Sequence, residues 1–178
     1  MTQLLKHGAH GDSVKELQSQ LSKLGFEVAA DGIFGAGTAA SVEELQALFG
    51  YEVDAQVGDA TQKLIAQQVS LGFDVQKPEA IKKAIEAFGE KTALKRVLKP
   101  GAEGADVRFL QRRLVTLGYS LTIDGKFGPA TEKAVRAVQQ AFGYDVDGSV
   151  GQATHKLLNQ QIGLSWSAGQ PTTRSAPQ

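Results

Sequence analysis

The chain has 178 residues, contains no cysteine and carries 19 Lys and Arg against 19 Asp and Glu, so its formal net charge is zero. The absence of cysteine excludes disulfides, thiol catalysis and thiolate metal sites. The balanced charge gives no general field that would attract nucleic acid or an anionic membrane, so neither is expected as a partner.

The first residues, Met1 to Gly8, lack the apolar run of a secretory signal peptide. No stretch of the chain approaches the roughly 20 apolar residues that span a bilayer. We therefore expect a protein that is made in the cytoplasm and does not cross a membrane.

The first predicted helix begins near residue 13 and ends near residue 24. Ser13 and Glu16 form a capping-box pattern at its start, and Gly25 stands where a left-handed C-terminal cap belongs. Apolar residues at helical spacing predict one buried face: Val14, Leu17, Leu21 and Leu24.

Two more helices follow in the same copy. Asp31 and Gly32 mark a turn, after which Thr38 is the predicted N-cap of a second helix and Thr61 that of a third. The apolar face of the second helix contains Val42, Leu45 and Phe49, and that of the third contains Leu64 and Ile65.

The segment from Leu98 repeats the segment from Leu5 at an offset of 93 positions, without a gap, as far as Gln67-Gln68 and Gln160-Gln161. Roughly half of the paired positions are identical, which is the mark of a duplicated structural unit. The helices of the second copy are accordingly predicted with caps near Thr131 and Thr154.

The segment between the copies contains a further predicted helix. It starts at Pro78 and carries Ile81, Ile85 and Phe88 on one face, with Gly89 after it. We expect this helix to dock on one of the copies. The predicted organisation is a first domain at 1–72, a linker with a short helix at 73–97, a second domain at 98–164 and a flexible tail at 165–178.

Both copies resemble the peptidoglycan-binding domain type 1 family, a three-helix unit. The second copy carries the family pattern most closely, through Gly101, Gly104, Val107, Leu110-Gln111, Leu114, Leu117-Gly118-Tyr119, Asp124-Gly125-Lys126-Phe127-Gly128, Thr131, Ala134-Val135, Gln139, Asp147-Gly148-Ser149-Val150-Gly151, Thr154 and Leu157. The first copy departs from it at Phe26, Ser41 and Ala55. The resemblance implies an all-α fold of two tandem three-helix domains joined by a helical linker.

The motif residues allow two interpretations. Asp-Gly pairs form tight turns, phenylalanines fill hydrophobic cores and threonines cap helices. Most of the motif is therefore expected to stabilise the fold. The functional alternative is a shallow groove beside the turns, whose ligand would be the glycan strand or the stem peptide. Its candidate binding residues are Asp31, Gly32, Phe34, Gly35, Tyr51, Tyr119, Asp124, Gly125, Phe127, Gly128, Gln139 and Tyr144.

No catalytic or metal centre is predicted. His7 and His10 are a pair in one loop, but zinc needs about three protein ligands, and the second copy has Pro100 and Glu103 at the matching positions. Neither a Ser-His-Asp catalytic triad nor a P-loop can be identified in the sequence. The sequence therefore predicts a protein that is not an enzyme and needs no cofactor.

The resemblance implies a non-catalytic peptidoglycan-binding protein with two modules, acting at the cell wall or outside the cell after lysis or export. Two alternatives remain open. One is a structural or docking component of a phage tail or contractile injection particle, with protein partners in a larger assembly. The other is the wall-targeting part of a lytic enzyme. We expect the second copy to bind better, because Tyr119, Gly125 and Gly148 follow the family pattern.

Overall fold

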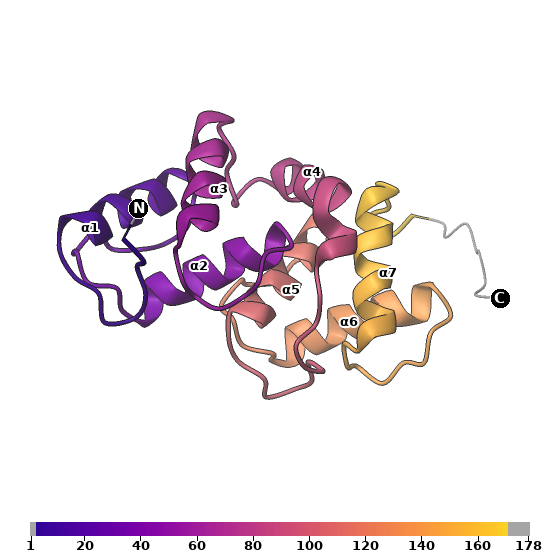
Figure 1. Ribbon diagram of the computed structural model, residues 1–178. Coiled ribbons are helices and arrows are strands. Elements are labelled where there is room, and N and C mark those ends of the chain that lie inside the picture. Colours follow the sequence, from indigo (N-terminus) through magenta and orange to yellow (C-terminus); the bar gives the residue numbers. More distant parts are fainter. Residues whose placement is uncertain (1–2, 171–178) are drawn as a thin grey trace.

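The structure is a computed structural model that describes residues 3–170. Within this range it is all-helical, as predicted. Domain 1 contains α1 (Asp12–Lys23), α2 (Ala36–Leu48) and α3 (Asp59–Ser70), and domain 2 contains α5 (Ala105–Thr116), α6 (Pro129–Ala141) and α7 (Gln152–Gly163). Between them lie α4 (Pro78–Phe88) and a single 3-10 turn, η1 (Gly89–Lys91). Figure 1 shows the two domains side by side, with α2 of one against α5 of the other.

The N-caps differ from the prediction. Glycines, not serine or threonine, precede the helices of the two domains; Gly11, for example, precedes α1 and Gly35 precedes α2. The predicted cap Thr38 lies in the first turn of α2, where its buried hydroxyl is 3.1 Å from the side-chain amide nitrogen of Gln18. The hydroxyls of Thr131 and Thr154 are likewise 3.2 and 3.3 Å from the amide nitrogens of Gln111 and Gln139, and Thr61 is buried in the first turn of α3. The threonines were misassigned because each precedes an apolar helical run in the sequence.

Each domain holds its N-terminal segment by a short backbone bridge. Leu5 pairs with Val57 in domain 1, and Leu98 pairs with Val150 in domain 2. All four side chains are buried. The start of each copy is thereby fixed beside the start of its third helix, which closes the three-helix unit.

The structural similarity between the two copies extends past the last residues at which their sequences match. The N–H of Val75 donates to the carbonyl of Leu24 at 2.8 Å, and at the matching place the N–H of Ala168 donates to the carbonyl of Leu117 at 2.7 Å. Trp166 packs edge-on against Phe142, with ring centroids 4.9 Å apart. Residues 165–168 of the predicted tail thus lie against domain 2, while 171–178 lie outside the described residues. The domain limits at 72 and 164 stay predictions.

The linker helix α4 packs mainly on α5 and α7 of domain 2 (Figure 1). Its buried face consists of Ile81, Ala84 and Ile85. These residues join a single apolar cluster that runs through both domains. Each unit is small for independent folding, so this shared core is a physical reason for the two copies to pack as one body.

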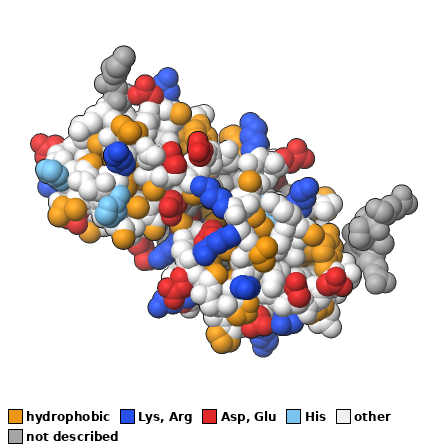
Figure 2. All heavy atoms as spheres, turned by 60° about the horizontal axis from the view of Figure 1, so that its bottom comes forward, with side chains coloured by type: hydrophobic (Ala, Val, Ile, Leu, Met, Phe, Trp, Pro, Cys, Tyr) orange, Lys and Arg blue, Asp and Glu red, His pale blue; other side chains and the backbone are white. Residues whose placement is uncertain are grey.

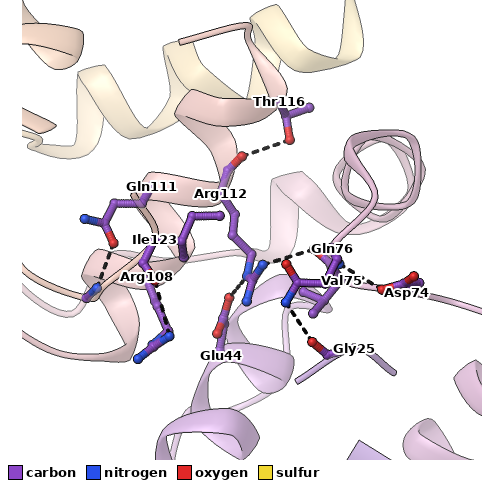
Figure 3. Close-up of polar contacts among 11 residues, drawn as sticks. Gly25, Glu44, Asp74, Val75, Gln76, Arg108, Gln111, Arg112, Thr116 and Ile123 are labelled. Carbon is purple, nitrogen blue, oxygen red and sulfur yellow. Dashed lines mark hydrogen bonds and ion pairs between the residues drawn. The ribbon is translucent and has the colours of Figure 1, made fainter. Parts of the chain in front are cut away.

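A buried ion pair crosses between the domains. Figure 3 shows Arg112, on α5, reaching Glu44 on α2 and the backbone of Val75, whose carbonyl accepts from Nη1 at 3.1 Å. The matching positions of the other copy hold Ser19 and Ala137, which cannot form this pair. Burial raises the pKa of the Glu44 carboxyl, and the Arg112 guanidinium acts in the opposite direction.

Candidate functional site

The most regular polar feature is a clamp in which a buried glutamine holds the following turn. In domain 2 the amide nitrogen of Gln111 donates to Asp124 Oδ1 at 2.8 Å, the Lys126 carbonyl at 3.1 Å and the Thr131 hydroxyl at 3.2 Å. Its carbonyl oxygen accepts from the N–H of Gly125 at 2.8 Å. One side chain therefore fixes both the turn and the start of α6.

A glutamine holds the following turn in this way four times in the described chain, and all of these glutamines except Gln46 also contact the threonine that follows the turn. Gln18 and Gln46 form this clamp in domain 1, on Asp31 and Asp54 respectively, and Gln139 forms the second clamp of domain 2 on Asp147. A backbone N–H and the amide of Gln18 hold the pKa of Asp31 below its usual value. The amide of Gln111, together with a backbone N–H, does the same to the pKa of Asp124. The carboxylates of these turns thus already have hydrogen-bond partners within the fold.

These clamps explain where the predicted binding residues lie. Phe34 and Phe127 are buried in the core, and the side chain of Gln139 is buried and holds a turn. Asp31 and Asp124 are exposed, with Gly32 and Gly125 buried beside them, and Gly35 and Gly128 precede helices. Tyr51 is exposed, and Tyr119 and Tyr144 are half-buried. These residues flank separate turns and do not line the grooves described next; a role for them in binding stays a prediction.

A groove that the sequence did not indicate runs between α1 and α3 of domain 1. It has a volume of about 250 Å³. Its floor is apolar and includes Leu17 and Ile65, and its polar lining consists of Gln3, Ser13, Glu16, Gln20 and Gln62. Within the described part of the chain the side-chain amides of Gln20 and Gln62 make only long hydrogen bonds, 3.4 Å each. Their polar groups are therefore available to a ligand.

The matching groove of domain 2 is covered by the linker. His155 and Asn159 of α7 replace Gln62 and Ala66. The amide nitrogen of Asn159 donates to the Gly89 carbonyl at 3.0 Å and to the Thr92 hydroxyl at 2.8 Å. Nε2 of His155 lies 3.2 Å from the Thr92 carbonyl. The copies therefore differ in kind, because one groove is open and the other contains a segment of the chain itself.

The groove could have been found from the differences between the copies. Its polar positions change from one copy to the other, with Gln20 replaced by Arg113, and Glu16 by Phe109. The positions that stay identical, such as Gln18 and Gln111, hold the fold. A search for shared residues therefore selects structural ones and passes over the surface that distinguishes the domains.

His155 gives the groove of domain 2 a testable pH dependence. Nη1 of Arg113 can only donate, so Nδ1 of His155 accepts this hydrogen bond, at 3.0 Å. The proton of the neutral imidazole is therefore on Nε2, which faces Thr92. Burial, and then the charge of Arg113, lower the pKa of His155 to about 4. The unfolded chain therefore binds a proton between about pH 6.5 and pH 4 that the folded chain does not.

We expect this difference to remove about 2 kcal/mol of stability as the pH falls from about 7 to 4, with the full contribution present above about pH 6.5. Urea denaturation across this range measures it. The control is His155→Gln, which carries the residue of domain 1 and should flatten this part of the profile. Equal pH slopes for the two proteins would contradict the assignment.

Charge elsewhere on the surface is mixed. Figure 2 shows Lys and Arg side chains interspersed with Asp and Glu over one face of the molecule. No helix among residues 3–170 is both long and apolar enough to cross a membrane. The fold therefore defines a small three-helix module that occurs in two copies, one of which has an open groove.

Comparison with known proteins identifies the module. Residues 10–65 and 103–158 each match the family described as "Putative peptidoglycan binding domain", and the chain belongs to this family. It thus contains two tandem peptidoglycan-binding domains, as the motif residues predicted.

Similar proteins include enzymes of the cell wall. The N-acetylmuramoyl-L-alanine amidase CwlL of Bacillus licheniformis is 33% identical over 165 residues, which are 87% of this chain and 45% of the amidase. The zinc D-Ala-D-Ala carboxypeptidase of Streptomyces albus G is 44% identical over 66 residues, 35% of this chain and 26% of that enzyme. A solved peptidoglycan-binding protein from Clostridioides difficile, in complex with glutamine hydroxamate, has a TM-score of 0.38 and 35% identity, and the match covers 40% of this chain and 46% of that one.

The prediction that the protein is not an enzyme is wrong, because relatives that match most of this chain are named amidases. The prediction was based on this chain alone, and the two repeats and the linker account for most of its residues. The chain spans 45% of the length of the first two curated relatives it matches, and its own residues say nothing about the remainder.

Proposed function

We propose that the groove of domain 1 binds the stem peptide of peptidoglycan. The observation that carries the proposal is the lining of the groove, which places the amides of Gln20 and Gln62 above an apolar floor. A peptide offers amide groups to such side chains and small methyl groups to such a floor. A sugar ring prefers an aromatic face, and no aromatic residue is among those that line the groove.

The groove of domain 2 supports a preference for peptide. There the chain's own backbone, at Gly89 and Thr92, lies in hydrogen-bonding contact with His155 and Asn159. A surface that forms hydrogen bonds with peptide backbone in one copy is suited to do so in the other. Since the linker covers the second groove, we infer that domain 1 is the principal binder, which reverses the expectation drawn from Tyr119 and Gly125.

We also infer that the chain acts at the cell wall as the targeting part of a peptidoglycan amidase. The relatives that match most of the chain are named amidases, and the chain spans under half of their length. A module that holds an enzyme on an insoluble polymer raises the effective concentration of enzyme at its substrate.

The test is a pull-down of the whole chain with insoluble sacculi from Bacillus licheniformis. The double variant Gln20→Ala, Gln62→Ala should bind about tenfold more weakly or worse, because it loses two side chains that can each make a hydrogen bond to the ligand. The matched control is Gln67→Ala, which removes an exposed amide of the same helix outside this groove. Its binding should equal that of the unchanged chain.

Competition then separates the possible ligands. Free stem peptide should release the chain from sacculi, whereas glycan strands stripped of peptide should not. The unchanged chain in excess should also slow the B. licheniformis amidase on the same sacculi, and the double variant should not. Release by bare glycan, or full binding by the double variant, would refute the proposed groove.

A further inference from the structure

Arg113 is a buried cation without an acidic partner. Its side chain is fully buried, and within residues 3–170 it takes part in no ion pair. Nη1 donates to His155 Nδ1 and to the side-chain oxygen of Asn159, both at 3.0 Å. The guanidinium carbon also lies 4.4 Å from the ring centroid of Phe109. Every one of these neighbours is neutral.

Two donors of this guanidinium are unused. Nε and Nη2 of Arg113 are buried and have no hydrogen-bond partner in the described structure. Burial lowers the pKa of Arg113 to about 9, so the group is still charged near neutral pH. A buried charge with unsatisfied donors is costly, and buried guanidinium groups in proteins are normally paired. The same position in domain 1 holds Gln20, so the fold itself does not require an arginine there.

A hollow lies beside Arg113. It has a volume of about 340 Å³ and is lined by Arg113, Phe109 and His155 of domain 2, by Leu94 and Lys95 of the linker, and by Val53 of domain 1. A water molecule takes up about 30 Å³, so the hollow has room for a small organic acid.

The charges around the hollow limit what it can take. Glu43, Glu103 and Asp106 also line it, and Asp106 is already paired with Arg96 at 2.7 Å. A ligand with several negative charges would be repelled by Glu43 and Glu103. A single carboxylate fits better, because it can accept from two guanidinium nitrogens at once.

We propose that Arg113 is the anchor of a monocarboxylate-binding site in the hollow between domain 2, the linker and domain 1. The two unused guanidinium donors are the groups that hold the carboxylate. The site is separate from the groove of domain 1, so the proposal stands or falls independently of the stem-peptide proposal.

The probes are N-acetylalanine and its neutral amide, N-acetylalaninamide, each titrated into the whole chain at constant ionic strength. Side-chain NMR of arginine Nε–H groups reports on Arg113 directly. The acid should shift the Arg113 resonance in a saturable way, and the amide should shift it at least tenfold less at the same concentration. The variant Gln20→Ala, Gln62→Ala should give the same titration as the unchanged chain.

The matched variant is Arg113→Gln, which places the residue of domain 1 in domain 2. The acid should raise the melting temperature of the unchanged chain and leave that of Arg113→Gln unchanged. The backbone NMR spectrum of Arg113→Gln checks that it is folded, and Arg113→Met serves as a second variant if it is not. Equal shifts with acid and amide, or a melting response to the acid that survives the loss of Arg113, would overturn the proposal.

Discussion

Replacing Arg112 by alanine is expected to lower the free energy of unfolding by about 3–5 kcal/mol, because it leaves a carboxylate buried without a cation. The side chains of Arg112 and Glu44 are 6% and 2% exposed, and the pair lies where α5 meets α2. Arg112 also donates to the carbonyl of Val75, so its loss weakens the contact of domain 2 with the segment that closes domain 1. Urea denaturation near neutral pH measures the effect.

The double variant Glu44→Ala, Arg112→Ala separates the charge from the packing. Removing both partners of a buried pair costs far less than removing one, so the double variant should recover much of the lost stability. The control on the same helix is Arg108→Ala, whose side chain makes one long hydrogen bond, 3.4 Å, to the Ile123 carbonyl. It should cost under about 1 kcal/mol. If the double variant were as unstable as Arg112→Ala, Glu44 would not be the group that Arg112 neutralises.

The periodic features of the sequence predicted the helices well, because they depend on local spacing. The apolar faces of both copies, the helix beginning at Pro78 and the left-handed residue Gly25 were all readable from residues close together in the chain. The N-caps were not, because a threonine hydroxyl can satisfy a helix N–H or a distant glutamine amide with the same sequence around it. Only the packing of α1 on the following turn decides between them.

How the two domains pack against each other could not be predicted from the sequence, for a different reason. Arg112 and Glu44 are 68 positions apart and stand in different copies, so no spacing rule connects them. Likewise, the docking of Thr92 on His155 depends on where the linker runs. The candidate site was missed in the same way, since the motif drew attention to identical residues and the groove consists largely of residues that differ.

Replacing Gln111 by leucine is expected to cost about 3 kcal/mol of stability, the second large effect. The change keeps a buried apolar stem but removes an amide that serves four groups, among them the Asp124 carboxylate and the N–H of Gly125. Each buried group left without a partner costs about 1–3 kcal/mol, and relaxation and water recover part of the sum. Thermal and urea denaturation of the whole chain provide the measurement.

Replacing the clamp glutamines also tests whether the residues that are identical in the two copies maintain the fold or bind the ligand. Gln18→Leu removes the matching clamp of domain 1 and should cost a similar amount, whereas Gln140→Leu, an exposed change on α6, should cost under about 0.5 kcal/mol. At a temperature where Gln111→Leu remains folded, its binding to sacculi should equal that of the unchanged chain. A Gln111→Leu variant that kept full stability but lost wall binding would show instead that Gln111 and Asp124 contact the ligand, and that the duplicated motif forms a binding surface.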